Sequence, residues 1–209
     1  MNQKIESTLK FYKLCNKLKD TIRKGHLIWN VKRKRIESVA EHIYGVQMLA
    51  LSIYYQFGYK LNIEKVIYML AIHELEEIKI GDLAFFEIDD QEKLLEGKKA
   101  TNYILKDILG KEEISKILDE FNERKTEEAI FAYHCDKLEF DMQMKLYDQE
   151  NCCDINHQEN NPVINNKEVI RCLENANKVS DVCIEFDREK YQDDENFIQI
   201  IDYLKENDI

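Results

Sequence analysis

Proline and glycine are scarce in this chain. Its 209 residues include one proline, Pro162, and six glycines. A protein built from short strands needs frequent tight turns, and such turns favour glycine and proline. The scarcity therefore argues against an all-β fold and predicts long helices, because both residue types are poor helix formers.

Long apolar runs and a basic excess are also missing. No segment approaches about 18 consecutive apolar residues, the length of a membrane-spanning helix, so we expect no membrane span. The first residues lack an apolar core followed by small residues, so export is not expected and a cytoplasmic location is favoured. The chain has 30 basic and 41 acidic side chains, a net charge of −11. This charge repels a phosphate backbone, so nucleic acid is not the expected partner.

The cysteines show no repeated spacing that would indicate a disulfide framework or a structural metal site. In an intracellular chain of this size the simplest interpretation is free thiols. Cys152 and Cys153 are adjacent and lie near His157. Because no second spaced pair accompanies them, a zinc site there is not favoured.

The composition is that of a folded protein. Hydrophobic residues make up 44% and charged residues 34%, and the length suits one domain over residues 1–209. Apolar residues recur at helical spacing along most of the chain, which predicts an all-α fold with a basic loop at 23–35 and a polar loop at 150–165. The expected helices cover residues 3–20, 36–58, 62–81, 89–109, 112–122, 126–149, 166–187 and 192–206.

Polar side chains interrupt the apolar stripes of three expected helices. A stripe that faces the core of a protein is normally apolar throughout. Where a carboxylate lies on such a stripe, it is usually paired, protonated or bound to a metal, because burying it alone costs several kcal/mol. The residues in question are His42 on 36–58, His73, Glu74 and Glu77 on 62–81, and Asp136 on 126–149.

These polar residues are most simply explained together. One inward histidine alone is usually a hydrogen-bonded core residue. Histidines and carboxylates on three helices are jointly satisfied by a shared divalent cation, for which this ligand set favours Mn, Fe, Co or Mg, with Zn possible. An open coordination position would activate water. Glu77, one turn after His73, would handle protons beside the metal.

Three stretches of the sequence resemble the HD-domain metal phosphohydrolases. They are ESVAEH at 37–42, HELEEIKIGDL at 73–83 and CDKLEF at 135–140, and the branch they resemble most is the 5'-deoxynucleotidases. The resemblance covers residues of about 14–147. It implies an HD-domain helical bundle, with C-terminal helices at about 166–206 packing on this core, one divalent metal ion and a homodimer.

The resemblance also implies roles for individual residues. His42 and the pair His73-Glu74 match metal ligands of the family, although the family carries His-Asp where this chain has His-Glu. Two further departures are Lys24-Gly25-His26, where relatives often carry a tryptophan, and the absence of the usual proline after Asp82. The remaining implied roles are a metal ligand for Asp136, catalytic acids for Glu77 and Asp82, and a phosphate contact for Arg23.

The leading functional hypothesis is a metal-dependent phosphohydrolase that converts deoxynucleoside 5'-monophosphates to deoxynucleoside and phosphate. One alternative is a phosphatase for another nucleotide or small phosphate ester. Another is a regulator that binds nucleotide or metal without turnover, but a pure binder does not need both Glu77 and Asp82. A third interpretation treats the basic run at 32–35 as an anion site for RNA. Four charges in a loop are more often a solvated face or a dimer contact.

Overall fold

The fold is built from helices. The computed structural model describes residues 2–83 and 87–209, and within them the regular secondary structure is helical apart from one isolated β-bridge between Ile22 and Ser38. The prediction of an all-α protein is confirmed. In the same part of the chain, no helix is both long and apolar enough to cross a membrane.

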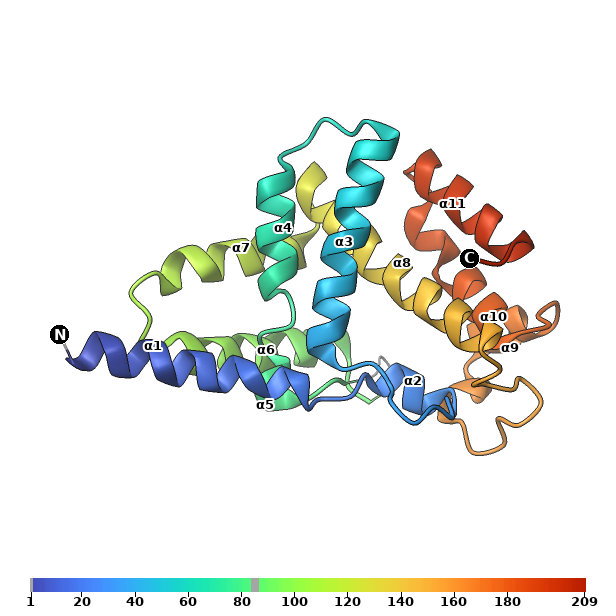
Figure 1. Cartoon of the computed structure of the whole chain (residues 1–209), viewed down its shortest axis with the longest axis horizontal. Helices are drawn as coiled ribbons and strands as arrows, with labels where there is room; N and C mark the ends of the chain where they lie inside the picture. Colours follow the sequence, from blue (N-terminus) through green and yellow to red (C-terminus); the bar gives the residue numbers. More distant parts are fainter. Residues whose placement is uncertain (1, 84–86) are drawn as a thin grey trace. The chain divides into compact units, whose positions relative to one another are not determined.

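Contacts divide the chain into two compact units. Unit 1 consists of residues 1–24 and 37–133, and unit 2 of residues 25–36 and 134–209. One helix, α8 (Glu127–Gln149), begins in unit 1 and continues without interruption into unit 2. It is drawn in yellow in Figure 1.

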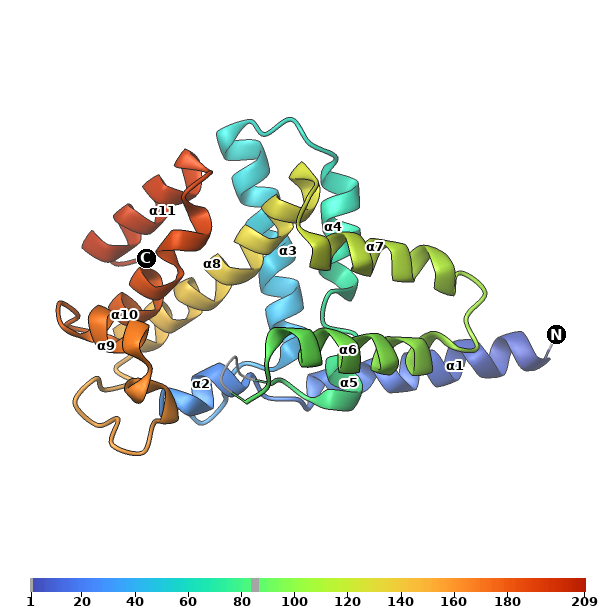
Figure 2. The same cartoon turned by 180° about the vertical axis from the view of Figure 1, so that it is seen from behind.

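Unit 1 packs its helices around a small apolar core. Helices α3 and α4 lie side by side, as Figure 1 shows, and Figure 2 shows α6 and α7 from behind with the connection between them. The core includes Val39, Leu75 and Leu105. The helices are α1 (Asn2–Cys15), α3 (Val39–Phe57), α4 (Ile63–Ile72), α5 (Glu77–Ile80), α6 (Asp90–Leu105), α7 (Lys111–Glu123) and the first turns of α8.

Helix α3 begins and ends where the sequence predicts. Ser38 is its N-cap and accepts a hydrogen bond from the backbone N–H of Glu41, whose carboxylate accepts one in return from the N–H of Ser38 at 2.9 Å. This reciprocal capping box satisfies two amides that the helix itself leaves unpaired. Gly58 ends the helix at φ +68°, a left-handed conformation that glycine adopts without steric cost.

The expected helix over 62–81 is wrong in its second half. Asn62 caps the helix as predicted, but α4 ends at Ile72, and residues 73–76 form a turn before α5. In this turn the N–H of Leu75 donates to the carbonyl of Ile72 at 3.0 Å. Such i→i+3 bonds wind the backbone more tightly than an α-helix does. The turn therefore changes the directions of the side chains that the helical pattern had placed on one stripe.

Unit 2 has its own core around the later part of α8. Trp29, Met144 and Val182 are buried in it. The expected basic loop contains a short helix, and the expected helix over 166–187 is two helices with a break between them. All six cysteines are free. The helices are α2 (Lys24–Ile28), α9 (Lys167–Leu173), α10 (Val179–Asp187) and α11 (Glu195–Glu206).

Candidate metal centre

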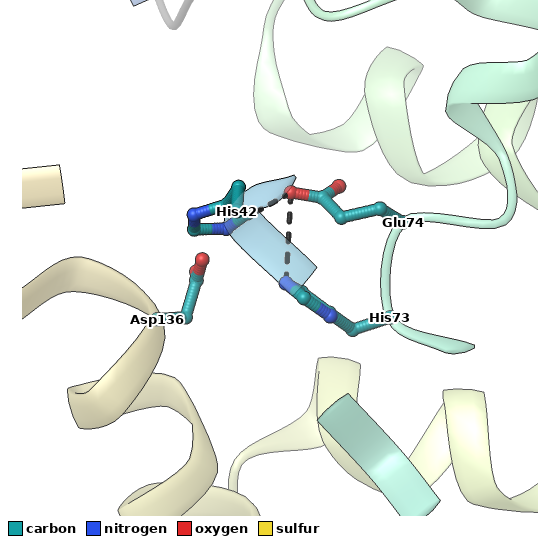
Figure 3. Close-up of side chains that lie close together, drawn as sticks. All are labelled: His42, His73, Glu74 and Asp136. Atoms are coloured by element: carbon teal, nitrogen blue, oxygen red, sulfur yellow. Dashed lines mark ion pairs between the residues drawn. The ribbon is translucent and has the colours of Figure 1, made fainter. Parts of the chain in front are cut away.

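Two histidines and a glutamate of unit 1 point toward one another. His42 lies in the first turns of α3 and His73 directly follows α4; both are buried, and their ring centroids are 5.5 Å apart. The Oε1 atom of Glu74 is 3.7 Å from Nε2 of His42 and 3.6 Å from Nε2 of His73. Figure 3 marks both distances with dashed lines. The structure thus brings together three of the residues that the sequence singles out.

The backbone of α4 fixes the orientation of the His73 ring. Its Nδ1 lies 2.8 Å from the carbonyl oxygen of Leu70. A carbonyl only accepts, so Nδ1 carries the hydrogen and Nε2 presents its lone pair toward Glu74. Histidines that bind metals in proteins are held in this way, with the second nitrogen donating to a carbonyl or a carboxylate.

The fourth expected ligand, Asp136, is a buried residue of α8 and belongs to unit 2. Within unit 1, ligand atoms of His42, His73 and Glu74 lie within 4.8 Å of one another. Two imidazole nitrogens and a carboxylate are donors that suit a divalent transition metal or Mg²⁺. The residues present therefore fit the ion that the sequence predicts.

Arg23 and Asp82 lie beside this cluster. Nη1 of Arg23 is 3.2 Å from Oε1 of Glu74 and 3.8 Å from Oδ1 of Asp82. Asp82 also accepts a hydrogen bond from the backbone N–H of Lys24 at 2.6 Å. The β-bridge next to Arg23 holds its backbone, whose N–H donates to the carbonyl of Glu37 at 2.9 Å. A guanidinium placed here is suited to bind a phosphoryl group.

Glu77 is a buried carboxylate at the start of α5. Burial raises the pKa of Glu77 well above its usual range, and the negative charges of Glu74 and Asp82 raise it further, while Arg23 acts in the opposite direction. A buried carboxyl group whose pKa is raised in this way is a candidate for proton transfer.

The two other departures from the family pattern fall in different places. Lys24 pairs with Glu87 in unit 1, whereas His26 is buried in unit 2, where its ring stacks on Phe140. The segment after Asp82 that lacks the usual proline includes residues 84–86, which lie outside the described residues. His26, which occupies the sequence position of the tryptophan in relatives, therefore belongs to unit 2 and not to the unit that contains His42 and His73.

Glu37 is a polar neighbour of the site that the apolar stripes of the helices do not reveal. Its carboxylate lies within 4.8 Å of a ring nitrogen of His42. A signal for it exists in the sequence. Glu37 directly precedes the N-cap Ser38, and the side chain at that position meets the fourth residue of the helix, which here is His42.

A family model and several curated proteins are similar to this chain. The model described as "HD domain" matches residues 15–198. A 5'-deoxynucleotidase HDDC2 from Danio rerio is 31% identical over 149 residues, covering 69% of this chain and 72% of that protein. The 5'-deoxynucleotidase HDDC2 of Dictyostelium discoideum is 29% identical over 150 residues, covering 68% of this chain and 78% of its own.

Solved structures share the fold. A conserved hypothetical protein from Pyrococcus furiosus has a TM-score of 0.67 at 26% identity and covers 95% of this chain and 99% of its own. A protein described as a predicted metal-dependent phosphohydrolase from Magnetospirillum magnetotacticum has a TM-score of 0.58 at 25% identity. That match covers 68% of this chain and 73% of the other.

Proposed function

This chain belongs to the HD-domain family of phosphohydrolases, and we propose that it hydrolyses deoxynucleoside 5'-monophosphates to deoxynucleoside and phosphate. The convergence of His42, His73 and Glu74 beside Arg23 is the observation that carries the proposal. The names of the curated relatives support the nucleotide substrate. The buried acid Glu77 supports turnover rather than binding alone.

We propose that one divalent ion, Mn, Co, Fe, Mg or Zn, is held by His42, His73 and Glu74. Such an ion polarises phosphoryl oxygens and lowers the pKa of water. The lone pair of Nε2 on His73 is already directed toward Glu74 by the bond from Nδ1 to Leu70. Asp136 is the fourth proposed ligand, on the resemblance of CDKLEF at 135–140 to the family.

The remaining side chains of the site divide the work on the substrate. Arg23 binds the phosphoryl oxygens and neutralises charge that develops on them. Glu77 and Asp82 handle the protons of the attacking water and of the leaving 5'-oxygen. Asp82 is held for this role by the backbone N–H of Lys24.

The test of this proposal is a phosphate-release screen. The protein is stripped with a chelator, reloaded with Mn, Co, Mg or Zn, and offered deoxynucleoside and ribonucleoside 5'-monophosphates together with sugar phosphates. We expect release from deoxynucleoside 5'-monophosphates above the others. The alternative of a different phosphate ester predicts another preferred substrate in the same screen.

The matched control is His73→Ala. This variant removes one ligand, so we expect it to contain less metal by elemental analysis and to release no phosphate. Equal metal content in both proteins would contradict the ligand assignment. Absence of phosphate release from every ester, with metal bound, would favour the regulator that binds without turnover.

The domain organisation, location, partners and assembly of the chain stay predictions. We propose that both units act as one HD-type domain over residues 1–209, supported by a family match that spans both of them. A small-molecule substrate in place of nucleic acid is supported by the net charge of −11. A cytoplasmic location stays a prediction from the sequence. A homodimer is supported by the family resemblance, and its measurement is given below.

A further inference from the structure

His42 belongs to two groups of polar side chains. One is the candidate metal cluster, which its Nε2 faces at 3.7 Å from Oε1 of Glu74. In the other, a carboxylate oxygen of Glu37 and a ring nitrogen of His42 lie within 4.8 Å of each other. An imidazole has only two nitrogens, so the second group is available to Nδ1.

The chemistry of imidazole decides what the second group does. A neutral histidine has one N–H donor and one lone-pair acceptor. When Nε2 gives its lone pair to a cation, Nδ1 carries the hydrogen. An N–H does not ligate a second cation, but it donates well to a carboxylate. The second group is therefore a hydrogen-bond acceptor for His42 rather than a second metal site.

The start of α3 explains why Glu37 reaches His42. Ser38 is the N-cap, so Glu37 precedes the cap and His42 is the fourth helical residue. Side chains at these two positions meet across the first turn, usually as an apolar pair. Here a carboxylate and an imidazole occupy the same two positions. The backbone of Glu37 is itself anchored, because its carbonyl accepts the N–H of Arg23 at 2.9 Å.

We propose that Glu37 is a positioning residue for the metal centre. Its carboxylate accepts a hydrogen bond from Nδ1–H of His42, which keeps Nε2 turned toward the ion and makes that nitrogen a stronger donor. The inference rests on the proposed function, which counts His42 among the metal ligands. Glu37 suits this role because its backbone is fixed beside the first turn of the helix that carries His42.

The test measures Co²⁺ binding to the metal-stripped protein against a competing chelator. We expect Glu37→Ala to weaken Co²⁺ binding by about 10- to 100-fold, the usual effect of losing such a partner. Glu37→Gln should fall between this variant and the wild type, because its amide oxygen still accepts a hydrogen bond but carries no charge. The visible absorption of bound Co²⁺ should change as well, since the ring is less firmly oriented.

The matched control is Glu41→Gln, one residue from His42. Glutamine also completes a capping box, so we expect Co²⁺ affinity equal to that of the wild type. Thermal unfolding of each metal-free variant shows whether the fold is intact, and Glu37→Gln, which keeps the size of the side chain, carries the test if Glu37→Ala does not fold.

Two outcomes would overturn the inference while leaving the metal centre in place. In the first, His73→Ala loses Co²⁺ binding but both Glu37 variants bind as tightly as the wild type. In the second, Glu41→Gln weakens Co²⁺ binding as much as Glu37→Gln does, which assigns the loss to the helix terminus rather than to a hydrogen bond from His42. If the wild-type protein itself takes up no Co²⁺, the proposed function fails together with the inference.

Discussion

Glu74 replaces the aspartate that the HD-domain family carries in its His-Asp pair. It is longer than aspartate by one methylene, about 1.5 Å of reach. Its Oε1 nevertheless lies between the Nε2 atoms of His42 and His73, at 3.7 and 3.6 Å. Glu74 lies in the tight turn that follows α4, and its Oε1 also forms an ion pair with Nη1 of Arg23 at 3.2 Å. The longer side chain therefore still brings its carboxylate close to both histidines.

The first prediction concerns this substitution. Glu74→Ala removes a carboxylate ligand, so we expect metal affinity to fall at least tenfold, about 1.4 kcal/mol. Glu74→Asp keeps the charge but shortens the reach, and should bind metal more tightly than the alanine variant. Calorimetric titration with Mn²⁺ measures both, and equal affinity of Glu74→Ala and the wild type would remove Glu74 from the ligand set.

The second prediction concerns Glu77. Burial and the charges of Glu74 and Asp82 raise the pKa of this carboxyl group, as expected of a proton-transfer residue. Glu77→Gln keeps the shape but cannot accept a proton, so turnover should fall by about 10²- to 10⁴-fold with little change in metal content. Steady-state kinetics with parallel elemental analysis checks this, and a wild-type rate would exclude Glu77 from the mechanism.

At the scale of elements, the N-terminus of α3 supports the site. The capping box of Ser38 and Glu41 fixes the first turn, where His42 lies, and Ser38 also forms the β-bridge with Ile22, next to Arg23. A helix end stabilised in this way keeps His42 in place whether or not an ion is bound. The stability of one helix terminus and the geometry of the metal centre are thus linked.

The third prediction follows from this link. Ser38→Ala removes the side-chain acceptor for the N–H of Glu41 and should lower the free energy of unfolding by about 1 kcal/mol, or the melting temperature by roughly 2 to 4 °C. Ser52→Ala, on an exposed position of the same helix, is the control and should change stability little. Thermal unfolding of both variants and the wild type measures this. Equal melting temperatures of Ser38→Ala and the wild type would show that the cap does not stabilise the helix.

At the scale of the whole molecule, stability depends on a buried acid in unit 2. Asp141 is completely buried, and Tyr191 donates its hydroxyl hydrogen to Oδ2 of Asp141 at 3.1 Å. Burial raises the pKa of Asp141 well above its usual range, and Asp187 adds to this effect while Lys190 opposes it. The folded chain therefore holds a proton that the unfolded chain releases above about pH 4.

The fourth prediction gives the sign of the resulting pH dependence. Because the folded state binds the extra proton, the contribution of Asp141 to stability is present below the unfolded pKa and is lost as pH rises toward the folded pKa. Asp141→Asn has no such proton to lose, so its stability should fall less between about pH 5 and about pH 8. The free energy of unfolding in urea, measured at both pH values, tests this. An equal fall for the wild type and for Asp141→Asn would contradict it.

The fifth prediction is the homodimer. A dimer should give a mass by light scattering of about twice 25.0 kDa at micromolar concentration. A mass near that of one chain at every concentration would refute it. The measurement should be made on both the stripped and the loaded protein.

Local patterns in the sequence determined the helical class, the limits of α3 and the identity of the polar residues. These are short-range properties: caps at Ser38 and Asn62, a left-handed stop at Gly58, and apolar spacing along one helix. They depend on neighbours within a few residues, so they can be derived without knowing the rest of the fold.

Only the tertiary structure decided how those residues meet. The sequence predicted one helix through His73, Glu74 and Glu77, whereas a tight turn at 73–76 directs Glu74 toward both histidines and leaves Glu77 at the start of α5. The contacts of Arg23 with Glu74 and Asp82 join segments more than fifty residues apart. Such contacts depend on packing between distant elements, which periodicity along one helix does not encode.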